Sequence, residues 1–211
     1  MVKIHVLQAS GRFTLYTKKI EKVARLAIKK VTAKIPVDNV DIVFCDNPWG
    51  VIPEIGIGAN TINAFLIFIY LDPVFKHFNK TINLEIERTI AHELYHCLRY
   101  PYPGYGRTLL GALVGEGLAD HFDIEVTGSK PAIWDAALSA VQMAKLGESA
   151  KKEYKNKNYN HFDWFYGSEK RGMPKWTGYT LGFKLVEDYL IKNSDLKPSS
   201  LFKIKPEKLI A

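Results

Sequence analysis

The segment 84–99 reads Leu-Glu-Ile-Glu-Arg-Thr-Ile-Ala-His-Glu-Leu-Tyr-His-Cys-Leu-Arg, with the apolar period of a helix and a His-Glu-x-x-His motif inside it. His92 and His96 are four residues apart, slightly more than one helical turn, so both imidazoles project from one face and can bind one metal ion. Glu93 follows the first histidine and can take a proton from water on that ion. The motif therefore predicts a metal site with a general base, against the alternative of two ordinary helix histidines.

A second helix is predicted at about 108–126, after a turn rich in proline and glycine at 101–106. This helix contains Gly-Glu-Gly-Leu-Ala-Asp at 115–120. Glu116 lies 20 positions after His96, which is enough chain to turn and return on a second helix. A catalytic zinc site of the two-histidine, one-glutamate type needs a third ligand delivered in this way.

Two aspartates follow Glu116 near the same helical face. Asp120 lies four residues after Glu116 and could accept the spare N–H of a zinc-bound histidine. Asp123 competes for this role. The alternative for Glu116 and for Asp120 is an exposed carboxylate with no function. His121 turns about 140° away from Glu116 on the helix, so we do not expect it to be a ligand.

The other predicted elements are strands first and helices after. Strands are expected at 40–44 and 61–71, and helices at 18–31, 131–145 and 180–192. Residues 147–160 are polar and predict a loop, whereas the aromatic stretch 161–166 predicts core. The strand at 61–71 fits an edge or a central place equally well. This order indicates an α+β fold with a small N-terminal sheet and a mainly helical C-terminal part.

Length and composition favour one soluble domain, residues 1–211, with a sheet-bearing lobe at about 1–100 and a helical lobe at about 101–211. Hydrophobic residues make up 47% of the chain and charged residues 24%, which excludes a disordered protein. The 29 basic and 22 acidic residues give a net charge of +7. That charge is spread along the chain without a nucleic-acid-binding motif, so a nucleic-acid partner is not expected.

Targeting signals and disulfides are not predicted. The N-terminus lacks the pattern of a secretory signal, and the longest apolar run, 64–71, is far shorter than the roughly 20 residues of a membrane span. The cysteines, Cys45 and Cys97, suit a reducing compartment and are expected to be buried thiols rather than nucleophiles. We therefore predict a cytoplasmic protein with no transmembrane segment.

These motifs carry a resemblance to known enzymes. The motif at 92–96, followed by Glu-Gly-Leu-Ala-Asp at 116–120, resembles the gluzincin metallopeptidases, including the thermolysin-like enzymes. More closely, the chain resembles a little-characterised bacterial family of predicted zinc-dependent proteases over roughly residues 40–190. That second match rests on four pieces of sequence: Trp49 to Glu54 with the Gly56 and Gly58 loop, Ala91 to His96, Gly115 to Asp120, and Gly178-Tyr179 with Gly182.

The resemblance implies a zincin-like fold in which one zinc ion per chain is ligated by three side chains: His92, His96 and Glu116. It implies that Glu93 is the general base, that Asp120 orients a ligand, and that the substrate is a peptide or protein. An edge strand beside the active-site helix would pair with an extended peptide. The fuller gluzincin pattern has Asn before the third-ligand Glu, where this chain has Gly115, so one potential substrate-binding side chain is absent.

Amide hydrolysis also builds negative charge on a tetrahedral oxygen, which a further donor can stabilise. The candidates in the C-terminal part are Tyr179, His161, Tyr166 and Arg171. We favour Tyr179 because it lies in the Gly-Tyr-x-x-Gly piece at the start of a helix, although it could instead be a packed aromatic residue. The sequence thus predicts a zinc-dependent peptide-bond hydrolase, and the alternative is a zinc-binding interaction or sensor module without turnover.

Overall fold

The computed structural model describes residues 1–102 and 106–210, so part of the predicted turn at 101–106 lies outside the described residues. The chain divides into two compact units. The first comprises residues 1–100 with 126–128, and the second comprises the described residues of 101–125 and 129–211. The first unit holds the sheet and the second is mostly helical, which confirms the predicted α+β class.

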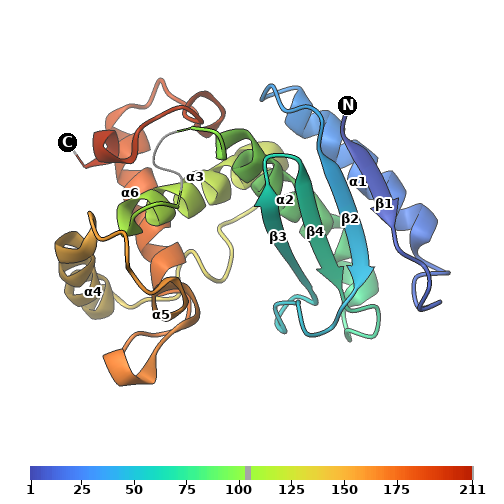
Figure 1. The fold of residues 1–211 in the computed structure, drawn as a ribbon, viewed down its shortest axis with the longest axis horizontal. Coiled ribbons are helices and arrows are strands. Elements are labelled where there is room, and N and C mark those ends of the chain that lie inside the picture. The colour runs from blue at the N-terminus through green and yellow to red at the C-terminus, as the bar shows by residue number, and fades with distance from the viewer. Residues whose placement is uncertain (103–105, 211) are drawn as a thin grey trace. The chain divides into compact units, whose positions relative to one another are not determined.

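The sheet of the first unit has four strands in the order β1-β2-β4-β3 (Figure 1). Their bounds are β1 Lys3–Val6, β2 Asp41–Asp46, β3 Ile57–Asn63 and β4 Leu66–Leu71. β1, β2 and β4 pair in parallel, whereas β3 runs antiparallel to β4 at the edge of the sheet. The short strand β1 was not predicted from the sequence.

The single strand predicted at 61–71 is wrong, because this segment is part of the β3–β4 hairpin. The chain reverses at Ala64 and Phe65, and the side chain of Asn63 accepts a hydrogen bond from the Phe65 N–H at 2.8 Å. The turn contains neither glycine nor proline, so the apolar run hid it. The sequence left open whether this segment lies at the edge or in the centre of the sheet. In the structure β3 is an edge strand and β4 is an interior strand.

Two helices, α1 (Thr17–Thr32) and α2 (Phe78–Arg99), lie on one face of this sheet (Figure 1). α2 presents a fully buried apolar row at four-residue spacing: Ile82, Ile86, Ile90 and Leu94. This row fixes the rotation of the helix and so determines where its polar residues point. α2 begins six residues before the predicted start at 84, because Phe78 and Ile82 extend the same buried row.

The second unit packs four α-helices around an aromatic core. Their bounds are α3 Leu109–Thr127, α4 Ala140–Glu153, α5 His161–Tyr166 and α6 Thr177–Lys192. Single-turn 3-10 helices occur at Glu169–Arg171, Pro198–Ser200 and Pro206–Leu209. The core includes Leu113 of α3, Leu146 of α4, Trp164 and Phe165 of α5, and Leu181 of α6.

Glycines allow the backbones of α3 and α6 to touch. A Cβ atom on Gly117 would lie 2.2 Å from the carbonyl oxygen of Gly182, and a Cβ on Gly182 would lie 2.2 Å from that of Leu113. No side chain larger than hydrogen fits either position without movement of a backbone. The helix that carries Glu116 is therefore held against α6 at the residue that follows this glutamate.

Three predictions for the C-terminal half are wrong in part. The helix expected at 131–145 begins at Ala140, because a capping box between Ser139 and Gln142 starts it there. The loop expected at 147–160 is helical as far as Glu153. In the aromatic stretch 161–166 only Trp164 and Phe165 are buried, whereas Phe162 and Tyr166 are mostly exposed.

Candidate metal centre

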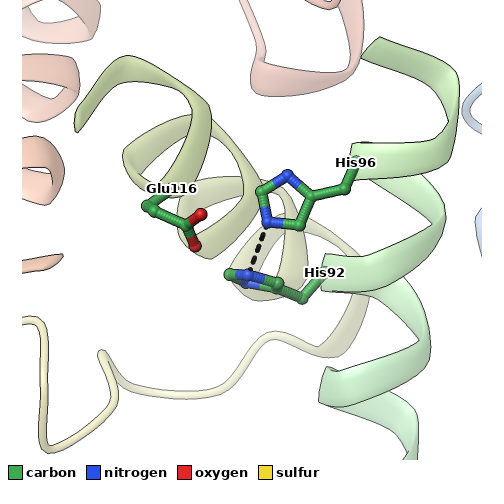
Figure 2. A group of neighbouring side chains, drawn as sticks. All are labelled: His92, His96 and Glu116. Carbon is green, nitrogen blue, oxygen red and sulfur yellow. Dashed lines mark hydrogen bonds between the residues drawn. The ribbon is translucent and has the colours of Figure 1, made fainter. Parts of the chain in front are cut away.

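The two histidines of the motif face each other on α2. The His92 and His96 rings have centroids 4.6 Å apart, and their Nε2 atoms are separated by 2.9 Å (Figure 2). His96 is buried and His92 is half-buried. The apolar row of α2 packs against the sheet and α1, which leaves this second row of the helix to carry the imidazoles.

This arrangement fits a zinc ion in its spacing and its chemistry. Two imidazole nitrogens at about 2.0 to 2.1 Å from a tetrahedral ion lie about 3.3 Å apart. The observed Nε2–Nε2 distance of 2.9 Å is within a few tenths of an ångström of that separation. Small rotations of the two rings would therefore allow both nitrogens to bind one ion. Two neutral imidazoles with a carboxylate are also a donor set that suits zinc.

The side chain of Glu93 contacts Thr61 on the edge strand β3. The Glu93 side chain is buried, and its Oε2 accepts a hydrogen bond of 2.6 Å from the hydroxyl of Thr61. The same hydroxyl lies 3.2 Å from the backbone oxygen of Glu93. Sequence reasoning did not find Thr61, because no local pattern links positions 32 residues apart.

Glu116 belongs to one of two sets of side chains suited to a metal in the described part of the chain. The first set is His92, His96 and Glu116, and the second is His92, Asp120 and Asp123; within each set the ligand atoms lie within 4.8 Å of one another (Figure 2). Glu116 is half-buried on α3. The structure thus contains His, Glu and Asp groups that could hold a metal ion.

Asp120 is fully buried, which excludes the alternative of an exposed acid, and Asp123 is fully buried as well. The indole N–H of Trp134 donates to Asp120 Oδ1 at 3.2 Å, and Asp135 lies close to the same carboxylate. Burial, followed by the negative charge of Asp120, raises the pKa of Asp135 to about 9. Asp135 therefore holds a proton at neutral pH, and sequence analysis had not singled it out.

Tyr179 packs among aromatic residues of the second unit. Its ring meets Phe165 edge-on at 5.1 Å and lies 6.4 Å from that of Trp134. His161 stacks on Phe165 at 4.3 Å and lies 3.3 Å from the Tyr159 hydroxyl. Partial desolvation lowers the pKa of His161, and the negative charge of Glu116 opposes this change.

The other candidates have structural surroundings. His121 stacks on Phe183 at 4.0 Å, and its Nε2 is 3.1 Å from the Phe183 carbonyl oxygen. Arg171 pairs with Glu153 at 2.6 Å and with Asp163 at 3.6 Å. His121 and Arg171 therefore take part in the packing and the ion pairs of the second unit.

Both cysteines are free thiols. Burial raises the pKa of Cys97 to about 12, which agrees with the prediction of a buried thiol that is no nucleophile. Cys45 is only half-buried, so the same prediction is wrong for its degree of burial.

Two histidines four residues apart on a helix, with a glutamate directly after the first, form a pattern typical of zinc metalloproteases. The chain belongs to the family described as "Predicted Zn-dependent protease (DUF2268)", whose model matches residues 20–211. This match confirms the resemblance to a little-characterised family of predicted zinc-dependent proteases that was identified from the sequence. No curated protein and no solved structure matches the chain. Within residues 1–102 and 106–210, no helix is long and apolar enough to cross a membrane.

Proposed function

We propose that this protein is a zinc-dependent peptide-bond hydrolase in which Glu93 is the general base. The observation that carries the proposal is the facing pair of Nε2 atoms on His92 and His96, 2.9 Å apart, on the helix that also carries Glu93. A purely structural zinc site has four protein ligands and no use for a carboxylate beside water. Membership of a family described as Zn-dependent supports the same metal.

The ligands in this proposal are His92, His96 and Glu116, with one zinc ion per chain. When bound, zinc supplies a Lewis acid that polarises the scissile carbonyl and lowers the pKa of water. Glu93 takes the proton of the attacking water on a carboxylate oxygen and delivers it to the leaving amine nitrogen. Asp120 orients a histidine ligand through its ring N–H, and its burial supports a fixed orientation.

The remaining parts of the proposal concern the substrate. Tyr179 donates its hydroxyl hydrogen to the developing oxyanion. The edge position of β3 supports pairing with an extended peptide, because an edge strand has backbone groups available for another strand. The proposal also assigns the chain as a single zincin-like domain. The free thiols Cys45 and Cys97 support a reducing, cytoplasmic location.

The test measures metal content and hydrolysis on the same preparations. Zinc per chain is determined by elemental analysis for the wild type and for His92→Ala, Glu93→Gln and their controls. Cleavage is assayed with a mixed peptide library. We expect about one zinc in the wild type and in Glu93→Gln, none in His92→Ala, and hydrolysis in the wild type alone. Removing a general base is expected to lower the rate at least 100-fold.

Matched controls lie in the same unit. His77→Ala removes an exposed histidine just before α2, and Glu85→Gln neutralises another glutamate of α2. Both are expected to keep zinc and activity. A Glu93→Gln variant with full activity would refute the mechanism. Zinc in the wild type without cleavage of any peptide would instead favour an interaction or sensor module.

A further inference from the structure

The hydroxyl of Thr61 makes a short hydrogen bond to the carboxylate of Glu93. The Oγ1–Oε2 distance is 2.6 Å, against 3.2 Å from Oγ1 to the Glu93 backbone oxygen. A hydroxyl has one proton to donate, and a carboxylate is a stronger acceptor than a carbonyl. The shorter contact is therefore the main one, and it joins the edge strand to the residue between the two histidines.

We propose that Thr61 is a positioning residue for Glu93, an inference that rests on the proposed function. The hydroxyl occupies Oε2, which leaves Oε1 of the same carboxylate to face water and take its proton. Glutamate has three rotatable side-chain bonds, so without this contact the carboxylate would sample several orientations. Misplacement of a catalytic group by about 1 Å can lower a rate 100-fold.

The local structure makes Thr61 suited to this role. Thr61 pairs with Ile67 of β4, whose side chain is buried on the sheet face that α1 and α2 cover. Its side chain therefore points toward α2. As a β-branched residue on a strand, threonine has few rotamers and holds its hydroxyl in place. Its strand neighbours Asn60 and Ile62 are exposed and point to the other face.

The kinetic test compares two substitutions at position 61. Thr61→Val keeps the shape and removes the hydroxyl, whereas Thr61→Ser keeps the hydroxyl. For Thr61→Val we expect kcat to fall about tenfold, which is about 1.4 kcal/mol in barrier height, with KM and zinc content within twofold of the wild type. Thr61→Ser should recover most of the activity, which a packing defect would not predict.

The control is Thr17→Val on α1, where the same change removes a hydroxyl that donates to the Phe13 carbonyl at 2.9 Å. Its kcat should equal that of the wild type. A Thr61→Val variant with wild-type kcat would overturn the positioning role while leaving the hydrolase intact. Absence of hydrolysis in the wild type would overturn the proposed function, and the positioning role with it.

A second measurement needs no activity. Denaturant unfolding is followed for the wild type, Thr61→Val, Glu93→Ala and the double variant. Because the two single changes remove the same hydrogen bond, we expect the unfolding equilibrium constant of the double variant to differ about tenfold from the product of the single effects. Effects that multiply within twofold would overturn the Thr61–Glu93 contact itself.

Discussion

Replacing Gly182 by alanine should destabilise the second unit strongly. The added methyl group would lie 2.2 Å from the Leu113 carbonyl oxygen on α3. Ordinary carbon–oxygen contacts in proteins are about 3.3 Å or longer, so the two helices would have to separate by about 1 Å at this point. Backbone atoms cannot swing aside as a flexible side chain can, and their movement loosens the packing of the surrounding core.

The magnitude follows from two opposing terms. Overpacking costs typically 1–3 kcal/mol, and about 3 kcal/mol applies here because both partners are helix backbone. Alanine has about 1 kcal/mol better helix propensity than glycine. The net loss is about 2 kcal/mol, which for a chain of this size lowers Tm by about 4–8 °C.

Gly147→Ala is the matched control. It is the same substitution in a helix of the same unit, yet its Cβ would lie 3.9 Å from Leu181 Cδ2, an ordinary contact. We expect it to raise stability by about 0.5–1 kcal/mol. Thermal unfolding followed by circular dichroism measures both variants. If Gly182→Ala melts at or above the temperature of the wild type, the close contact of α3 and α6 is refuted.

Three further changes test other parts of the structure. The pKa of Asp135 is raised to about 9 from an ordinary 3.8. Between these two pH values the native state holds a proton that the unfolded state releases, so the free energy of unfolding falls as pH rises from about 4 to about 9. Asp135→Asn should flatten this dependence in denaturant titrations at pH 5 and pH 9, and an unchanged slope would contradict the assignment. Ser139→Ala removes the cap of α4 and should cost about 1 kcal/mol, whereas Ser149→Ala, a change within the same helix that leaves the cap in place, should cost much less in the same assay. A chelator should lower Tm, because zinc at 100 times its Kd adds about 2.7 kcal/mol; the Tm of His92→Ala should not respond to it.

The parts of the site predicted from the sequence are those whose geometry is local. His92, Glu93 and His96 fall within five residues, and helical spacing alone determines which side chains share a face. Thr61 is 32 positions from Glu93, and their contact depends on how β3 packs on α2. No sequence pattern contains that information, because the same strand read from the sequence could occupy the edge or the centre of the sheet.

The burial of acidic residues was also not predicted from the sequence. Acids are usually exposed, so the sequence left an exposed carboxylate open for Asp120 and gave no signal for Asp135. Tertiary structure overrides this tendency by supplying partners, such as the Trp134 indole for Asp120 and the Ala132 N–H for Asp135. A cluster of buried acids is costly for stability, which is a reason to test whether it holds the proposed metal ligands in place.

The glycines around Tyr179 have a physical explanation that the sequence did not reveal. A Cβ on Gly178 would lie 2.7 Å from the Phe165 ring, and a Cβ on Gly182 would meet α3. The Gly-Tyr-x-x-Gly pattern therefore encodes the close packing of α6, with or without a catalytic role for Tyr179. This packing still serves the proposed site, because α6 touches α3 at Gly117, the residue after Glu116. The same contact that makes Gly182→Ala costly also holds the helix that presents the proposed third ligand.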